Sequence, residues 1–312
     1  MASWEQTQYS ADFDTGKFDK SKFDILNNLF VGDDEDIATL SDSFTAISNF
    51  KFIGSGTAIN PYQVRDWNEL TKCINKPFSY FKLMNDIDKN SDWYSVDAGS
   101  DANGGLGFRT IVLLFGGFDG NGKTINDLYV KRDGEDYQGV FGTVRGPVHD
   151  LGINASIFSD GDYVGALAGN LDSVGSVYNC KTTGKVEGAT KVGGMIGFQD
   201  DVTSLVKNCY SSVAVSGGDD VGGLVGRFLE GSCINCYSTG KVEGTTRVGG
   251  LIGSIGIGVA EDCFWDTETS QIGSSVAGSG LTTAQMQDVD TFSGAGWDIE
   301  EVNNWTDEVW VI

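Results

Sequence analysis

The sequence predicts an all-β solenoid in which coils of about 27–29 residues stack on one another. A hexapeptide of Val, Gly and other apolar residues occurs four times, and its copies begin 28, 29 and 27 residues apart. A second marker, Asn or Asp followed by Cys, recurs in phase with it at spacings of 29, 27 and 27 residues. The glycines at the second and sixth positions of the hexapeptide, and the cysteines of the second marker, are Gly165, Gly169, Gly193, Gly197, Gly222, Gly226, Gly249, Gly253, Cys180, Cys209, Cys236 and Cys263. Two markers in phase, in a chain with 44 Gly and 3 Pro, indicate repeated coils joined by tight backbone turns.

Residues 1–50 differ from the repeats and are predicted to form a separate arm. Phe-Asp pairs recur there at a spacing of five, beginning at Phe13, Phe18 and Phe23, and this spacing fits neither a simple strand nor a helix. The arm either caps the first coil or anchors the chain in a larger assembly. We expect no membrane insertion, because no apolar run approaches the length of a span and the first residues lack the features of a secretory signal.

The first part of the solenoid is expected to contain a helix and several strands. The helix begins after Asp66, and Glu69 completes a capping box. Residues 80–88 alternate in polarity as a strand does. Residues 115–128 are predicted as two strands joined by a tight turn, because Asp-Gly and Asn-Gly pairs stand between them at 119–122.

The solenoid as a whole is predicted over residues 51–263, with the repeated copies over 138–263. A small capping segment follows over 264–312, in which Thr282 or Thr283 caps a short helix. Large apolar side chains are suited to covering the open end of a solenoid. Those expected to do so are Trp297, Trp305 and Trp310.

Residues one coil apart stack directly in a solenoid, so their compatibility can be tested. The residues before three successive copies, Lys191, Asp220 and Arg247, alternate in sign, and neighbouring coils should therefore attract. The glycines fit places where the backbone takes a positive φ or approaches its neighbour too closely for a Cβ. The stacked cysteines are predicted to be buried, reduced thiols, with disulfides between coils as the alternative. A zinc site is not expected, because no second pair or nearby His completes the spacing of Cys233 and Cys236.

Charge and composition restrict the partners. The net charge of −23 disfavours nucleic acid and suits either a solubility surface or recognition of a basic partner or a cation. No cofactor is predicted except calcium, although neither acidic segment matches an EF-hand loop. The candidate calcium ligands are Asp119, Asn121, Asp160 and Asp162. The single histidine, His149, stands at a strand start and is expected to be a surface or turn residue. No catalytic residue is assigned, and the protein is predicted to be non-enzymatic.

The repeats resemble the GLUG motif (Gly-Leu-any-Gly) of bacterial and archaeal surface proteins. The resemblance rests on 221–226, 248–253 and the intervening 235–240. Segments that resemble the usual flanks of such repeats are 54–62, 81–88, 118–125, 264–269 and 281–286. The resemblance covers about residues 52–300 and implies a right-handed parallel β-helix of the kind found in adhesin-like proteins, with no catalytic site to carry over.

Together these observations predict a surface-displayed attachment or recognition protein, located on a virion or on a cell surface. On a virion it would be a tail fibre, a spike or a capsid decoration, and residues 1–50 would contact other particle subunits. Its partner would be a cell-surface protein or glycan, and a homotrimer is compatible with the edges of the coils. The alternatives are a β-helix polysaccharide depolymerase and a purely structural spacer. A cluster of Asp or Glu with Arg or Lys in one groove would favour the depolymerase.

Overall fold

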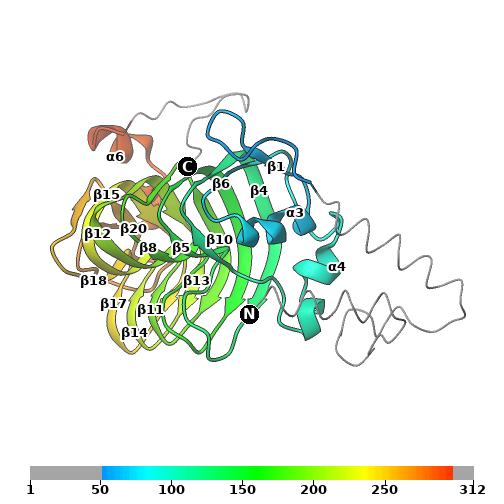
Figure 1. Ribbon diagram of the computed structural model, residues 1–312. Helices are drawn as coiled ribbons and strands as arrows, with labels where there is room; N and C mark the ends of the chain where they lie inside the picture. The colour runs from blue at the N-terminus through cyan, green and yellow to red at the C-terminus, as the bar shows by residue number, and fades with distance from the viewer. Residues whose placement is uncertain (1–50, 298–312) are drawn as a thin grey trace, which may run out of the picture. The chain divides into compact units, whose positions relative to one another are not determined.

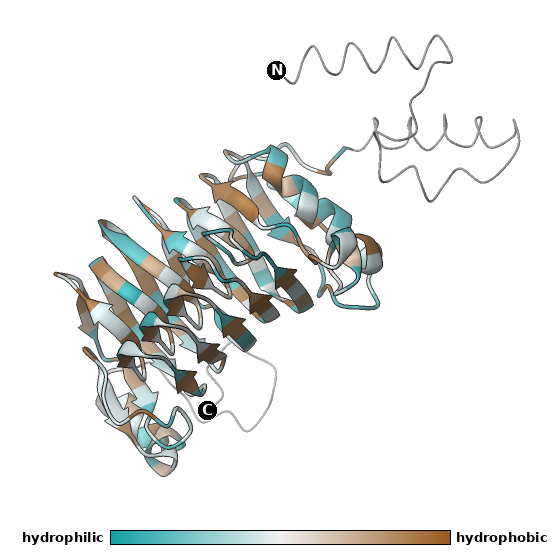
Figure 2. Cartoon of the chain, turned by 90° about the horizontal axis from the view of Figure 1, so that it is seen from below, coloured by the Kyte–Doolittle hydropathy of each residue, from teal (hydrophilic) through white to brown (hydrophobic). Residues whose placement is uncertain are grey.

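Most of the chain forms a parallel β-helix of about six turns, which confirms the predicted fold class (Figure 1). This computed structural model describes residues 51–297. The predicted arm over 1–50 lies outside the described residues, as do Trp305 and Trp310. Buried and partly exposed residues alternate along strands such as β2 (Tyr80–Leu83), and Figure 2 shows the corresponding alternation of hydrophobic and hydrophilic bands.

The β-helix begins with short strands and helices. The elements before the regular coils are β1 (Tyr62–Val64), α3 (Trp67–Lys72), η2 (Cys73–Asn75), β2, α4 (Tyr94–Asp97) and η3 (Ala102–Gly104). Asp66 caps α3 as predicted, because its Oδ1 accepts a hydrogen bond from the Glu69 amide at 2.8 Å. The capping box does not close: the Glu69 carboxylate accepts instead from the backbone amide of Arg65, at 2.7 Å, and pairs with its guanidinium.

The regular coils are built from short strands and from longer strands that bend between faces. Their bounds are β3 (Ile111–Leu114), β4 (Gly117–Lys131), β5 (Phe141–Val144), β6 (Pro147–Phe158), β7 (Val164–Gly165), β8 (Ala168–Leu171), β9 (Ser176–Tyr178), β10 (Lys181–Glu187), β11 (Thr190–Gly193), β12 (Ile196–Ser211), β13 (Ala214–Ser216), β14 (Asp219–Gly222), β15 (Val225–Ser238), β16 (Val242–Glu243), β17 (Thr246–Gly249), β18 (Ile252–Ile255), β19 (Val259–Glu261), β20 (Phe264–Asp266) and β21 (Ser279–Leu281). Within residues 51–297, β7, β11, β14 and β17 form a four-stranded sheet and the other strands form a 17-stranded network. The strands pair in parallel, so each coil lies on the previous one.

Apolar side chains stack inside the coils and form the core. One register position holds a column in which every side chain is buried: Phe81, Phe118, Val148, Val177, Val206 and Cys233. Such a column excludes water along the axis of the β-helix, and this burial is the main stabilising contribution to a fold of this kind.

The predicted hairpin over 115–128 is wrong. One strand, β4, runs through this segment and pairs in parallel with β2 on one side and β6 on the other. The Asn-Gly pair forms a corner, with φ of 55° at Asn121 and 69° at Gly122, and the register with β6 shifts there. Because both neighbouring coils already offer partners for the backbone, the strand bends around the β-helix and does not fold back on itself.

The glycines of the hexapeptide are needed for close approach and not for a positive φ. A Cβ on Gly193 would lie 2.0 Å from the carbonyl oxygen of Ile196, and one on Gly222 would lie 2.0 Å from that of Val225. The positive φ falls on the residue before each copy. These residues, with φ between 49° and 63°, are Tyr163, Lys191, Asp220 and Arg247. The predicted attraction is present between two of the three residues, since Arg247 forms an ion pair with the buried carboxylate of Asp220, whereas the Lys191 ammonium lies 3.7 Å from Asp162 Oδ2.

The C-terminal part packs α5 (Thr283–Met286) and α6 (Val289–Gly294) against the last coils, at the end away from α3 (Figure 1). Thr282 caps α5 with a complete capping box. Trp297 contacts aromatic rings of β15, β20 and α6, with ring centroids 5.1–6.1 Å apart. The buried aromatic members of this cluster are Tyr237, Phe264, Phe292 and Trp297. None of the helices in the described part of the chain has the length and apolar character that a membrane span requires.

Candidate functional site

Four polar side chains from four successive coils stack at one partly exposed register position. Lys82 pairs with Asp119, Asp119 with His149, and His149 with Tyr178. The Lys82 Nζ atom lies 2.8 Å from Asp119 Oδ2, and the rings of His149 and Tyr178 stack with centroids 4.8 Å apart and planes 8° from parallel. The coil register therefore places an ammonium, a carboxylate, an imidazole and a phenol in one row.

A ladder of side-chain amides follows this row at the next position of each coil. Its members have φ of 51–53°, a left-handed conformation that Asn and Asp tolerate better than most residues. Asn235 donates to Asn208 at 3.4 Å, Asn208 to Asn179 at 3.3 Å, and Asn179 to Asp150 Oδ1 at 2.9 Å. The ladder ends on Asp150, whose other oxygen, Oδ2, lies 2.7 Å from His149 Nδ1.

The row and the ladder meet in a group formed by Asp119, His149 and Asp150. One ligand atom from each residue lies within 4.8 Å of the other two, and His149 Nδ1 is 3.8 Å from Asp119 Oδ1. The side chains remain 25–42% exposed, so the group is open to solvent. His149 was expected to be a surface or turn residue without a role. The signal that could have found the group is the separation of Asp119 and His149 by about one coil, with Asp150 following directly.

The four candidate calcium ligands do not come together in one group. Asp119 joins His149, whereas the Asn121 side-chain amide donates to the Leu83 carbonyl oxygen at 3.1 Å. Asp160 accepts a hydrogen bond from the backbone of Gly134, and Asp162 Oδ2 lies 3.7 Å from the Lys191 ammonium. Within residues 51–297, neither Asp160 nor Asp162 belongs to a group of three potential metal ligands.

Buried thiols form a second group that could hold a metal. The Sγ atoms of Cys233, Cys236 and Cys263 lie within 4.8 Å of one another. All six cysteines of the chain are buried and free. Burial raises the pKa of the Cys209 thiol well above its usual range, while hydrogen bonds from Cys233 and Cys236 lower the pKa of Cys263 to about 4. The sequence did not predict a metal site at Cys233 and Cys236, because no second cysteine pair or nearby histidine completes their spacing. The next coil supplies a third thiol, that of Cys263.

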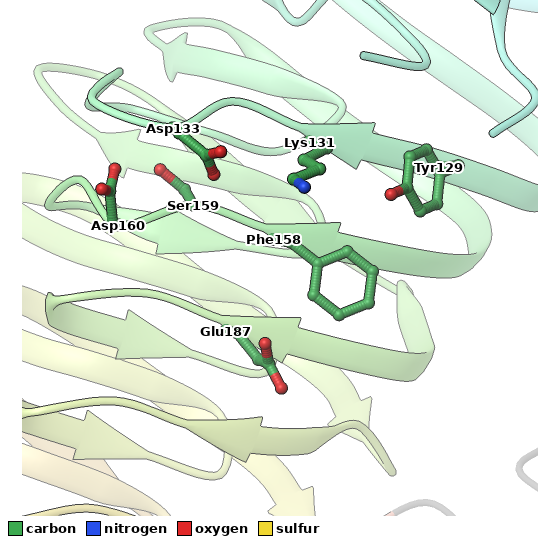
Figure 3. Close-up of a pocket in the computed structure, with 7 residues that line it drawn as sticks. All are labelled: Tyr129, Lys131, Asp133, Phe158, Ser159, Asp160 and Glu187. Atoms are coloured by element: carbon green, nitrogen blue, oxygen red, sulfur yellow. The ribbon is translucent and has the colours of Figure 1, made fainter. Parts of the chain in front are cut away.

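A hollow of about 410 Å³ opens on the side of the β-helix (Figure 3). Its lining comes from three coils that stack in register, Lys131 on Phe158 and Phe158 on Glu187. The rings of Tyr129 and Phe158 lie 5.7 Å apart at 49°. Figure 3 shows the aromatic rings at one end and the carboxylates of Asp133 and Asp160 at the other, with Lys131 between them. The residues that line the hollow are Tyr129, Lys131, Asp133, Phe158, Ser159, Asp160 and Glu187.

Comparison with known proteins finds a partial relative and a related fold. No protein-family model matches the chain, so the resemblance to GLUG repeats is not confirmed. The sequence is 35% identical to halomucin from Haloquadratum walsbyi over an alignment of 158 residues, which covers 47% of the chain. The chain spans only 2% of the length of halomucin.

The fold is similar to the crystal structure of a protein described as a putative immunoglobulin A1 protease from Bacteroides ovatus. The TM-score is 0.57 at 22% sequence identity, and the match covers 75% of this chain and 88% of that one. At this level of identity the similarity shows the fold alone.

The prediction of a non-enzymatic protein is contradicted by this structural neighbour, since a similar fold carries the name of a protease. The prediction rested on a single histidine and on the absence of a local catalytic motif. In a β-helix, however, side chains about one coil apart in sequence lie side by side, as Asp119 and His149 do. Charged groups can therefore assemble without any motif that a reading along the chain would find.

Proposed function

We propose that this chain is a surface-exposed β-helix module that recognises a glycan through the hollow around Phe158. The observation that supports this most directly is the combination of two partly exposed aromatic rings with charged groups in one open hollow on the side of the β-helix. The partial similarity to halomucin and the β-helix neighbour fit a surface or recognition role. More specifically, we propose that the module is displayed either on a cell, as an adhesin, or on a particle that attaches to cells.

The chemistry of the hollow suits a sugar ring. The rings of Tyr129 and Phe158 offer apolar surface to the C–H face of a pyranose, while carboxylates and an ammonium beside them can hydrogen-bond its hydroxyls. Three carboxylates line the hollow against one lysine, and the chain has a net charge of −23. A neutral or amino sugar is therefore favoured over a sulfated or uronic acid polymer.

Binding to immobilised neutral and amino-sugar polysaccharides tests the proposal. Phe158→Ala should lower the affinity at least tenfold, a loss of about 1.4 kcal/mol. Phe78→Ala is the matched control, because Phe78 is 73% exposed and lies outside the hollow. Equal binding by the two variants, or no binding to any such polymer, would contradict a glycan site in this hollow.

A second candidate function is hydrolysis of the bound glycan in the same hollow. The specific observation is that the carboxylates of Asp133, Asp160 and Glu187 line the same hollow as Lys131, since glycoside hydrolysis requires two carboxylates at the scissile bond. Release of new reducing ends from a polymer that binds would establish this activity. Asp160→Asn should then abolish the release and leave binding within threefold. A polymer that binds tightly and is never cut excludes hydrolysis without affecting the recognition proposal.

A further inference from the structure

We propose that Asp119, His149 and Asp150 bind a divalent transition-metal ion on the outer face of the β-helix. Two coils supply the ligands, Asp119 from β4 and the other two from β6. The Nδ1 atom of His149 lies 2.7 Å from Asp150 Oδ2 and 3.8 Å from Asp119 Oδ1. Ligand atoms around a tetrahedral ion stand about 3.4 Å apart, so these distances bracket the spacing that an ion requires. Partial exposure of all three side chains gives an ion access.

Neighbouring side chains hold both carboxylates in the orientation that binding requires. The Lys82 ammonium donates a hydrogen bond to Asp119 Oδ2 at 2.8 Å, and the Asn179 side-chain amide donates one to Asp150 Oδ1 at 2.9 Å. Asp119 Oδ1, which also accepts a hydrogen bond from the Asn121 backbone amide at 2.7 Å, and Asp150 Oδ2 are the oxygens that face His149 Nδ1. Such outer contacts fix the ligands of metal sites and reduce the entropy lost on binding.

The imidazole is fixed by stacking. Tyr178 lies against the His149 ring in nearly parallel planes, and parallel pairing of β6 with β9 sets the register of the two rings. Stacking fixes the plane of the imidazole, and the contact of 2.7 Å with Asp150 Oδ2 orients Nδ1 toward the carboxylates. The amide ladder that ends on Asp150 fixes the adjacent corner in the same way, so the three ligand atoms belong to a rigid part of the fold.

The donor set selects the kind of ion. One imidazole nitrogen with two carboxylate oxygens suits Zn²⁺, Co²⁺, Ni²⁺ or Mn²⁺ better than Ca²⁺ or Mg²⁺, which prefer oxygen donors throughout. Two carboxylates against the single Lys82 ammonium leave the group negative, and this favours a divalent cation. Three protein ligands leave coordination positions that a hydroxyl or carboxylate of a partner molecule can occupy.

Because His149 is the only histidine in the sequence, metal binding can be followed on the full chain without a variant. The chain is prepared without a histidine tag and kept in about 0.15 M salt, which screens the acidic surface. One equivalent of Zn²⁺, with Mg²⁺ and Ca²⁺ in excess, should shift the single imidazole resonance and slow its modification by diethyl pyrocarbonate at least tenfold. An unchanged resonance and an unchanged modification rate would overturn the proposal.

Variants distinguish binding at this site from nonspecific binding of cations to the acidic surface. His149→Gln and Asp150→Asn should each weaken Zn²⁺ binding at least tenfold in calorimetric titration, and Asp101→Asn, at an exposed carboxylate outside both candidate sites, should leave it unchanged. Circular dichroism confirms that each variant is folded. If the folded His149→Gln chain binds Zn²⁺ as tightly as the parent chain, the ion is held elsewhere, by surface charge or by the thiols of Cys233, Cys236 and Cys263, and the site is refuted.

Discussion

The contact between coils at Gly223 makes a sharp prediction about stability. A Cβ added there would lie 2.2 Å from the carbonyl oxygen of Gly250 and 2.9 Å from the Ser238 hydroxyl oxygen. Backbone atoms cannot move aside as a flexible side chain can. The Ser238 hydroxyl already donates to the same Gly250 oxygen at 2.7 Å, so Gly223→Ala disturbs both a backbone contact and a buried hydrogen bond.

The expected loss of stability follows from the distance by which the two coils must separate. To bring the new Cβ to an ordinary contact, neighbouring backbones must separate by about 1 Å, whereas the adjacent ladder bond from Leu224 N to Leu251 O is 2.9 Å long. Overpacking of this kind costs about 1–3 kcal/mol, and each weakened buried hydrogen bond adds about 1 kcal/mol. We expect a loss of about 3 kcal/mol, which for a domain of this size lowers the Tm by about 6–12 °C.

Thermal and urea unfolding followed by far-UV circular dichroism measure this loss. Gly273→Ala is the matched control, because an added Cβ meets nothing within 4 Å there and the residue is outside the left-handed region. That variant should remain within about 0.5 kcal/mol of the parent chain. A Gly223→Ala chain that melts within about 2 °C of the parent would show that the coils are not held at this separation, and the reasoning from close approach would fail.

Three further predictions concern charge and thiols. Asp200→Asn should stabilise the chain by about 1 kcal/mol at pH 8 and hardly at all at pH 3, as measured by urea unfolding, because burial and the charges of Asp172 and Asp201 raise the pKa of Asp200 from 3.8 to about 6. The ionised form therefore destabilises the fold fully above about pH 6, and this cost disappears as the pH falls through the pKa of 3.8 in the unfolded chain; an equal effect at pH 8 and pH 3 would contradict this. Arg247→Ala should lower the urea midpoint in the same assay, because the carboxylate of Asp220, 1% exposed, loses one of its two arginine partners and keeps only Arg227 at 3.7 Å; an unchanged midpoint would contradict that role. All six thiols should react with Ellman's reagent only after unfolding, because all are buried, and rapid reaction of any one in the native chain would show that its part of the core is accessible.

The period of the repeats predicted the fold because stacked coils must match in length. Local sequence patterns also predicted those features that depend on contacts between residues near in sequence. An example is the start of α3, which the carboxylate of Asp66 caps. The Asn-Gly signal in β4 failed, because parallel neighbours on both sides outweigh the preference for a hairpin. The left-handed corners at Tyr163 and Arg247 could not be predicted either. Tyr and Arg have little preference for that conformation, and hydrogen bonds to the adjacent coils impose it.

The candidate site was missed for a related reason. Asp119 pairs with His149 just before a bulge in β4, and the separation of paired residues falls from 30 at Asp119 to 28 at Lys123. A count of residues along the chain therefore finds the neighbouring coil but not the exact partner. The hollow raises the same difficulty, because Lys131, Phe158 and Glu187 share no motif and meet only through pairing of β4, β6 and β10.

Both candidate sites lie where the coils differ most from one another, and the geometry explains why they can. At the register position of His149, successive coils carry Lys82, Asp119, His149, Tyr178, Lys207, Ile234 and Glu261. The corner that follows is Asp or Asn with a positive φ in each coil from Asp150 to Asp262. The corner determines the path of the backbone, and the position before it only presents a side chain to solvent. Substitutions in the outward column should therefore change binding with little effect on stability, whereas substitutions at the corners and the close-approach glycines should do the reverse.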